Sequence, residues 1–254
     1  MEKSAMPEKD GRTVMPEDGI RINKYLAANG LCSRRDADKL IARGIVTING
    51  KKAEAGDRVQ DGDSVQVGKK AIAGKPRKVV LAYYKPVGVV CSERDKHAEK
   101  LLMNMINYPT RVTYAGRLDK DSEGLLLLSN DGDLIQAMMK GSAGHEKEYV
   151  VKMDKELTED FLRKMEQGVY LKELDKTTRP CRIIKEGKFT FHIVLTQGLN
   201  RQIRRMCEAL GYEVKHLKRI RVLNITLDDL QVGRYRELKE EELAALYRQC
   251  GLHR

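Results

Sequence analysis

Apolar residues recur with helical spacing near the start of the chain. The stretch INKYLAANG predicts a short helix that ends at Gly30, and RRDADKLIARG predicts a second helix with Ser33 as its N-cap and Gly44 after its last turn. IVTING then predicts a strand that closes in the tight turn Asn49-Gly50. GDRVQDGDSVQV adds another turn and an alternating strand. We therefore expect residues 21–67 to form a compact module of two helices followed by strands.

The pattern from residue 79 onward is longer and mixed. VVLAYYKPVGVVCS predicts a buried strand that Lys85-Pro86 breaks or places at an edge. Further strands are predicted at 125–128, in KEYVVKM and in TFHIVLTQG, and EVKHLKRIRVLNITL is rich in strand. Helices are predicted from Asp133, in LTEDFLRKMEQG, in NRQIRRMCEALG and from Lys239. Because helices and strands mix without βαβ regularity, we expect an α+β fold with a mainly antiparallel sheet.

Two segments lack a clear periodic pattern. Residues 1–20 have few large apolar side chains and two prolines, so we expect a flexible tail. Residues 68–78 are rich in Lys, Gly and Ala and are expected to be a basic linker. The predicted domains are therefore a tail (1–20), a small module (21–67), a linker (68–78) and a larger domain (79–250).

Charge is concentrated rather than spread evenly. The 254 residues carry 48 Lys and Arg against 37 Asp and Glu, a net charge of +11. Residues 68–80 hold five basic and no acidic residues, and residues 197–221 hold seven basic and two acidic ones. Clustered positive charge is typical of proteins that contact phosphates. A membrane surface is the weaker alternative, because neither stretch pairs its charge with an apolar face rich in Trp or Phe.

Composition also narrows the chemistry. No run of eighteen apolar residues is present, so we expect no membrane-spanning helix and no membrane partner. The five cysteines are scattered without a C-x-x-C pair, which argues against zinc and iron–sulfur sites and favours reduced thiols in the cytoplasm. Nucleotide-binding glycine motifs are absent too. We expect neither a metal nor a cofactor.

The densest motif is AGRLDKDSEGLLLLSNDG (115–132). Asp119 stands between a basic residue and a turn, directly before four leucines. An apolar floor raises the pKa of a carboxyl group unless a cation pairs with it, so Asp119 is a candidate functional acid. The alternative is that Asp119 only caps a turn, the role that we expect of Asp121 and Glu123.

Two further motifs supply candidate partners. In LTQGLNRQIRRMCEALGY, Arg204 follows the apolar Ile203 and could reach an interior carboxylate, in the site or in a structural ion pair; we expect Arg201 and Arg205 to contact phosphate or solvent. In HEKEYVV, Lys147 and Tyr149 share one face of a strand. The tyrosine ring could stack on a base or pack in the core.

Together these motifs resemble a known family. GRLDKDSEGLLLLSNDG, then KEY, then QGLNRQIRRM resemble, in order and spacing, the signatures of the RsuA-type family of ribosomal RNA pseudouridine synthases. RINKYLAANGLCSRRDADKLIARGIVTINGKKA resembles the alpha-L RNA-binding module of that family, first known from a ribosomal protein. The resemblance covers residues 21–250, and LKRIRVLNITL is most similar to the F-type large-subunit enzymes.

The resemblance implies a reaction and a set of residues. The activity would be isomerisation of uridine to pseudouridine, with Asp119 as the catalytic carboxylate that attacks C1′ or deprotonates C2′ of the sugar. Arg204 would be the ion-pair partner of Asp119, and Tyr149 would stack on the uracil. Lys85-Pro86 with Gly88 would shape the edge of the site. The pocket would be lined by Arg117, Leu118 and Ile203.

The resemblance also implies a partner. Ribosomal RNA would be the substrate, from the large subunit near the peptidyl-transferase region, with 16S ribosomal RNA or transfer RNA as alternatives, and the enzyme would be a monomer. A non-catalytic ribosome-assembly factor and a glycosidase are the competing functions; the second usually needs another carboxylate beside the bond. The expected RNA contacts are Lys24, Arg34, Arg35, Lys39, Arg43, Lys51, Lys52, Arg201 and Arg205.

Overall fold

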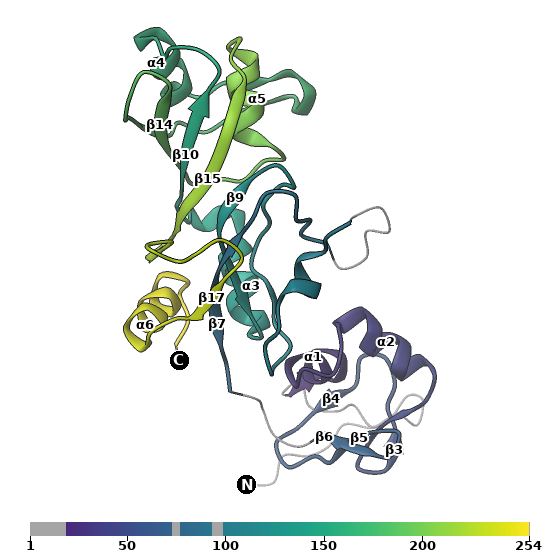
Figure 1. The fold of residues 1–254 in the computed structure, drawn as a ribbon. Helices are drawn as coiled ribbons and strands as arrows, with labels where there is room; N and C mark the ends of the chain where they lie inside the picture. Colours follow the sequence, from purple (N-terminus) through teal and green to yellow (C-terminus); the bar gives the residue numbers. More distant parts are fainter. Residues whose placement is uncertain (1–18, 73–76, 93–98, 254) are drawn as a thin grey trace, which may run out of the picture. The chain divides into compact units, whose positions relative to one another are not determined.

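The computed structural model describes residues 19–72, 77–92 and 99–253, apart from the side chain of Ser142. The chain divides into two compact units, Met1–Arg77 and Lys78–Arg254, and each is described by itself. Figure 1 labels the elements of both units. Most of the tail predicted for residues 1–20 lies outside the described residues.

The N-terminal unit is a small module of two helices and short strands. Its helices are α1 (Ile22–Ala28) and α2 (Arg34–Ala42), and the Ser33 side chain caps α2 by accepting a hydrogen bond from the backbone N–H of Asp36. The strands are β1 (Ile20–Arg21), β2 (Val46–Ile48), β3 (Lys51–Lys52), β4 (Arg58–Val59), β5 (Val65–Val67) and β6 (Lys70–Ile72). Both predicted helices and the Asn49-Gly50 turn are confirmed.

Two predicted boundaries of this module are wrong. Ile20 and Arg21 pair with Val59 and Arg58, so the ordered structure begins inside the predicted tail. Lys70–Ile72 pairs with β5 and extends the module's sheet into the predicted linker. Backbone pairing to β5 overrode the local composition, which is rich in lysine and glycine.

The C-terminal unit is built on one nine-stranded sheet in the order β13-β14-β10-β15-β9-β7-β17, with β16 paired to β15 and β8 paired to β9. Its strands are β7 (Val80–Lys85), β8 (Thr113–Tyr114), β9 (Glu123–Ser129), β10 (Lys147–Met153), β13 (Arg182–Lys185), β14 (Thr190–Leu195), β15 (Val214–Val222), β16 (Ile225–Thr226) and β17 (Tyr235–Glu237). A separate two-stranded sheet joins β11 (Tyr170–Leu171) and β12 (Lys176–Thr177). The predicted α+β class is confirmed.

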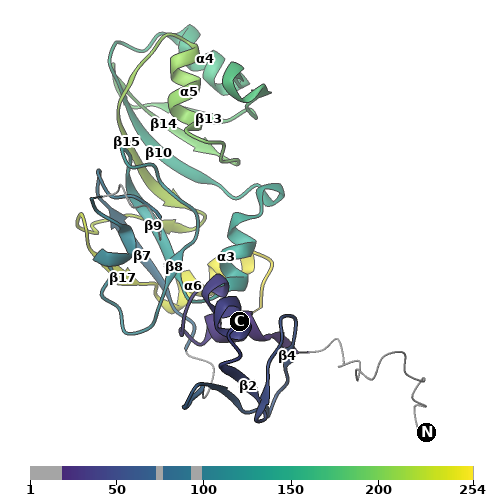
Figure 2. The ribbon, with the colours of Figure 1, turned by 90° about the vertical axis from the view of Figure 1, so that its right-hand side faces the viewer.

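Helices cover this sheet at both ends. The α-helices are α3 (Gly132–Met139), α4 (Glu159–Gln167), α5 (Gln202–Ala209) and α6 (Glu240–Gln249), and three short 3-10 helices span Leu102–Met105, Gly141–Ala143 and Lys172–Leu174. Figure 2 shows α4 and α5 beside β10, β14 and β15, and α3 and α6 near β7 and β9.

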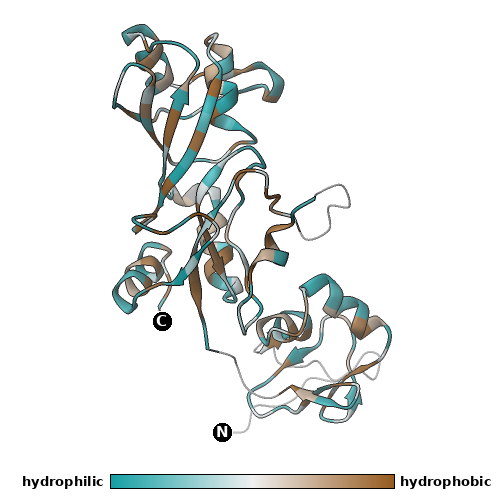
Figure 3. Cartoon of the chain, in the orientation of Figure 1, coloured by the Kyte–Doolittle hydropathy of each residue, from teal (hydrophilic) through white to brown (hydrophobic). Residues whose placement is uncertain are grey.

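The half of the sheet around β7 and β9 is buried on both faces. Leu125 and Leu127 face one apolar cluster, which α3 and α6 complete, and Leu126 and Leu128 face another around Leu102. A strand with both faces covered is a continuous hydrophobic run instead of an alternating one, which explains the four consecutive leucines. Figure 3 shows the same hydrophobic character along β7.

The half around β10 and β14 is buried on one face only. Val151, Phe191 and Ile193 pack against α4 and α5 in a third apolar cluster. Strand neighbours with the opposite orientation, such as Glu148 and His192, are polar and only partly buried. This half therefore shows the alternation that is typical of an antiparallel sheet with one solvated face.

The two halves meet where β9 runs parallel to β15. All other paired strands of the described residues are antiparallel. At the junction Gly124 lies opposite Arg219 with φ +109°, and a Cβ atom at Gly124 would lie 2.2 Å from the carbonyl oxygen of Arg219. Only glycine fits such a close approach of two backbones.

We predict that Gly124→Ala destabilises the protein by about 2 kcal/mol or more, because the new methyl group meets backbone that cannot move aside and the positive φ is strained. Urea unfolding of the purified variant measures the loss. Gly187→Ala is the matched control, since a Cβ at Gly187 meets nothing within 4 Å. Equal stability of the two variants would contradict the role of the junction.

Candidate active site

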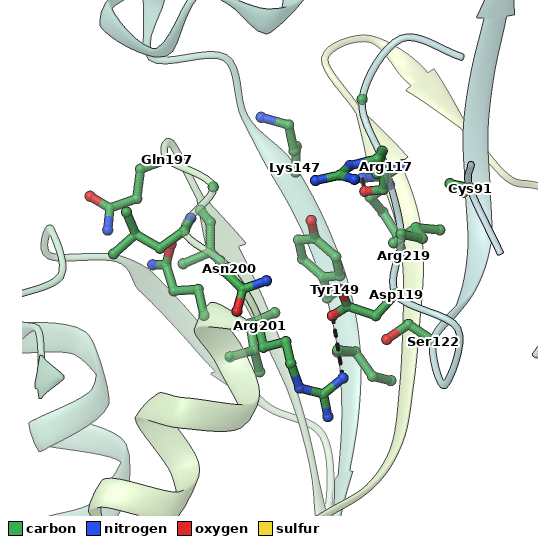
Figure 4. A pocket seen from close by; sticks show the side chains of 18 of the residues that line it. Cys91, Arg117, Asp119, Ser122, Lys147, Tyr149, Gln197, Asn200, Arg201 and Arg219 are labelled. Atoms are coloured by element: carbon green, nitrogen blue, oxygen red, sulfur yellow. Dashed lines mark hydrogen bonds and ion pairs between the residues drawn. The ribbon is translucent and has the colours of Figure 1, made fainter. Parts of the chain in front are cut away.

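A cavity of about 540 Å³ lies beside the junction of β9 and β15. Its volume falls within the range of small-molecule sites. The segment after β7, the loop before β9, strands β10 and β15 and the first turn of α5 all contribute to its wall (Figure 4). The pocket residues expected from the sequence all line it: Arg117, Leu118, Asp119, Tyr149, Ile203 and Arg204.

Asp119 occupies a loop that β7 and the segment after it hold in place. The backbone N–H of Gly88 donates to the carbonyl oxygen of Lys120 at 2.7 Å. The Lys85 ammonium is fully buried and donates to the carbonyl oxygens of Ser122 (2.7 Å) and Pro86 (2.9 Å). These contacts give the Lys85-Pro86 strand end its physical role, because they fix the backbone directly after Asp119.

The sequence analysis placed Lys85 at the edge of the site but did not predict that its ammonium group is buried. A lysine at the end of a wholly apolar strand was the available signal, because a buried ammonium needs hydrogen-bond acceptors. Burial lowers the pKa of Lys85, and the nearby Cys91 and Asp119 oppose that shift.

Arg201, not Arg204, approaches the candidate carboxylate. An Arg201 terminal nitrogen lies 3.9 Å from an Asp119 oxygen, and the Asp119 side chain is 35% exposed. Arg201 precedes α5 and has φ +50°, a left-handed conformation that aims its side chain across the pocket. Sequence spacing could not reveal this turn of the backbone.

Arg204 lies in the first turn of α5 and contacts the loop that follows Asp119. It donates to the carbonyl oxygens of Asp121 (2.9 Å) and Val214 (3.1 Å), and its Nε lies 3.2 Å from an Asp121 carboxylate oxygen. The expected Arg204–Asp119 ion pair is therefore wrong in this structure. Arg204 instead ties the loop to α5 and β15.

The two acids that we expected to cap turns have other roles. Asp121 accepts two hydrogen bonds from Arg201, at 2.8 and 3.1 Å. Glu123 accepts from the Tyr84 hydroxyl at 2.9 Å and lies 3.1 Å from His216 Nε2. Partners distant in sequence outcompeted the local turn hydrogen bonds.

The Asp121 carboxylate forms ion pairs with both Arg201 and Arg204. Burial raises the pKa of its carboxyl, but the hydrogen bond from Arg201 and the charges of Arg204 and Arg201 outweigh burial and hold the pKa below its usual 3.8. The carboxylate therefore stays ionised and keeps Arg201 beside Asp119, while it holds Arg204 against the loop after Asp119.

Tyr149 faces Asp119 from β10, with Arg219 beside it on β15. The strand register pairs Tyr149 with Ile193 and with Arg219. Arg219 is only 3% exposed; its Nε donates to the carbonyl oxygen of Leu125 at 2.7 Å and its guanidinium lies 6.0 Å from the Tyr149 ring centre. The sequence analysis missed Arg219, although its spacing of two from buried Leu217 was a usable signal.

Much of the basic segment 197–221 is neutralised inside the fold. Five of its seven basic residues form ion pairs: Arg201, Arg204, Arg205, Lys215 and Arg221. Arg205 contacts Glu173 and Asn200 and does not line the cavity. Part of the charge that we assigned to phosphate contact thus stabilises the domain.

The candidate RNA contacts of the N-terminal unit form a separate set. Arg34, Arg35, Lys39 and Arg43 are exposed along α2, although Lys39 forms an ion pair with Asp36 at 3.0 Å. Lys51 and Lys52 are exposed on β3, and Lys24 is half-buried on α1. The solvent-facing side of α2 is thus strongly basic.

The described part of the chain contains neither a candidate metal cluster nor a candidate membrane span. No cluster of three or more His, Cys, Asp or Glu residues there could hold a metal ion. No helix there is long and apolar enough to span a membrane.

We predict that Asp121→Asn lowers stability at neutral pH by on the order of 1 kcal/mol, because it removes the charge from a half-exposed ion pair. The depressed pKa makes this contribution present above the unfolded-state value of 3.8, and it is lost as the pH falls through the folded-state pKa. Urea unfolding from pH 7 to pH 2 should show the difference from wild type shrinking below about pH 4. The exposed Asp229→Asn variant is the control; a pH-independent difference would contradict the role of Asp121.

Comparisons with known proteins show the family of this chain. The family model for RNA pseudouridylate synthase matches residues 79–209, and the S4 domain model matches residues 20–65. The chain is similar to the dual-specificity RNA pseudouridine synthase RluF of Escherichia coli (44% identity, covering 92% of this chain and 81% of that protein). It is also similar to ribosomal large subunit pseudouridine synthase B of Bacillus subtilis (36% identity, covering 89% and 95%).

A solved structure confirms the fold. A crystal structure of pseudouridylate synthase superposes with a TM-score of 0.66 at 27% identity, covering 90% of this chain and all of that one. The protein is therefore an enzyme of the RNA pseudouridylate synthase family, with an S4 domain ahead of its catalytic domain.

Proposed function

We propose that this enzyme converts one uridine of 23S ribosomal RNA, near the peptidyl-transferase region, to pseudouridine. The observation that carries the proposal is the Asp119 carboxylate, which lines a pocket with Tyr149 on one side and Arg201 at 3.9 Å on the other. The similarity to RluF supports an RNA target, and the similarity to the large-subunit enzyme of Bacillus subtilis supports a ribosomal one.

The reaction exchanges one glycosidic bond for another. The bond from N1 of uracil to C1′ of ribose breaks, the base turns within the pocket, and a bond from C5 to C1′ forms. C5 gives up its proton and N1 gains one, so atoms and electrons balance without an oxidant, a metal or a nucleotide cofactor. Asp119 either attacks C1′ or removes the proton at C2′, and both routes need its ionised form. Arg201 places a positive charge 3.9 Å from this carboxylate.

The other pocket residues would hold the extruded nucleotide. Tyr149 would stack on the uracil, and the apolar Leu118 and Ile203 would exclude water around it. The base must first leave its stack, which costs a few kcal/mol. Phosphate contacts of the S4 domain would offset that cost, with the basic face of α2 and the exposed lysines of β3 as the proposed contact residues.

The proposal extends to the setting of the reaction. A ribosomal RNA substrate would place the enzyme in the cytoplasm, where its five free cysteines would stay reduced. We also propose a monomer as the active form.

We predict that Asp119→Asn abolishes turnover. Purified protein would be incubated with ribosomal RNA transcripts that carry tritium at C5 of uracil, and tritium released to water counts the isomerised uridines. The variant should lose at least a thousandfold in rate while it still binds RNA, and Asp229→Asn should match wild type. If wild type releases no tritium from any ribosomal RNA fragment, the protein acts instead as a binding or assembly factor.

We further predict that cells without this gene lack one pseudouridine of 23S ribosomal RNA. Pseudouridine mapping of total RNA from cells with and without the gene identifies the position. The name of the dual-specificity relative supports a second RNA substrate, and transfer RNA, the alternative expected from the sequence, belongs in the same comparison. Loss of a site in 16S ribosomal RNA alone would refute the proposed target.

A further inference from the structure

Three cationic side chains of the pocket lack a carboxylate partner. Lys147 donates a long hydrogen bond of 3.4 Å to the carbonyl oxygen of His145, Arg219 donates to Leu125, and Arg117 is exposed. Within the described residues, no carboxylate oxygen lies within 4 Å of the side-chain nitrogens of these three. Arg201 and Arg204, by contrast, both form ion pairs with the Asp121 carboxylate.

Lys147 is intermediate in burial between the buried Arg219 and the exposed Arg117. It is half-buried on β10, and burial, followed by the charge of Arg219, lowers its pKa. A desolvated ammonium group beside a guanidinium group is costly unless an anion compensates both charges. The fold does not supply that anion among the described residues, so a ligand is the physical candidate.

The position of these cations identifies the ligand. Lys147 and Tyr149 are two residues apart on one strand and therefore project to the same face. Figure 4 shows Lys147 and Arg117 on one side of Tyr149, with Asp119 and Arg201 on the other. A nucleotide with its base on Tyr149 and its sugar at Asp119 would place a backbone phosphate within reach of Lys147. Phosphates are the charged groups of RNA, and lysine and arginine are the residues that bind them.

We propose that Lys147, together with Arg117 and Arg219, binds one backbone phosphate that flanks the target uridine. This inference rests on the proposed function and extends it from the base and sugar to the phosphate. Arg117 reaches the phosphate from the pocket rim, and Arg219 contributes charge from behind the Tyr149 ring. The contact holds the extruded nucleotide so that its C1′ stays beside Asp119.

The test is a double-mutant cycle that combines one substitution in the protein with one modified phosphate in the RNA. The RNA is the fragment that mapping identifies, made in three forms: unmodified, with an uncharged methylphosphonate on the 5′ side of the uridine, and with one on the 3′ side. Wild type and Lys147→Met are compared on all three, by kcat/KM from tritium release and by affinity from filter binding. The matched control is Lys152→Met, an exposed lysine of the same strand.

One methylphosphonate should cost wild type about tenfold in affinity and in kcat/KM, the size of one charged hydrogen bond. Lys147→Met should lose a similar factor on unmodified RNA and nothing further on that methylphosphonate RNA. Lys152→Met should respond like wild type. The sensitive side, 5′ or 3′, identifies the phosphate.

Two outcomes would overturn the proposal. In the first, Lys147→Met and each methylphosphonate lower the affinity independently, so that their combined effect is the product of the separate factors. In the second, wild type binds both methylphosphonate RNAs as tightly as the unmodified RNA. Thermal unfolding checks that Lys147→Met is folded, and Lys147→Arg should restore most of the affinity because it keeps the charge. A wild type that modifies no RNA would refute the proposed function, and with it the phosphate contact that rests on it. An active wild type with independent losses would refute the phosphate contact alone.

Discussion

The catalytic unit depends on the close contact between Gly124 and Arg219. There β9 and β15 run parallel, and a side chain on Gly124 would collide with the backbone of Arg219. The contact joins a half-sheet that is buried on both faces to one that is buried on one face. Asp119 lies in the loop just before β9, and Tyr149 lies on β10, which pairs with β15. The distance between acid and ring is thus set by two backbone pairings, of β9 with β15 and of β15 with β10.

Electrostatics then divides the pocket into two regions. On one side Asp121 neutralises much of the charge of Arg201 and Arg204 and fixes their positions near Asp119. On the other side, no carboxylate oxygen of the described residues lies within 4 Å of the side-chain nitrogens of Lys147, Arg117 or Arg219. A paired region can orient a catalytic acid, whereas an unpaired region can receive an anionic ligand. Some of the basic residues behind the net charge of +11 therefore stabilise the fold through ion pairs, and others are available to bind an anion.

The Asp119 loop shows how buried polar groups can specify a site. Lys85 has no carboxylate hydrogen bond in the described residues, but it donates to two backbone carbonyl oxygens. The second of these belongs to Ser122, three residues after Asp119. A buried donor accepts few alternative arrangements, because each lost hydrogen bond leaves a desolvated charge. Lys85 thus restricts the loop to one conformation without contacting the pocket's acid directly.

Local sequence determined most of the elements of this protein. Periodicity and caps located the helices from Arg34, Glu159 and Glu240, and the run of four leucines marked the buried strand. The motifs around Asp119, Tyr149 and Arg204 were enough to indicate the family and the pocket. These features are local because a cap, a turn or a buried face needs only neighbouring residues.

Only the tertiary structure decided which charges meet. The left-handed backbone at Arg201 places that residue beside Asp119 and leaves Arg204 to Asp121. The pairing of Lys70–Ile72 with β5 likewise turned an expected linker into part of a sheet. Ion pairs and strand pairs join residues that are far apart in sequence. Their choice depends on the packed geometry of the whole unit, which no single stretch of sequence contains.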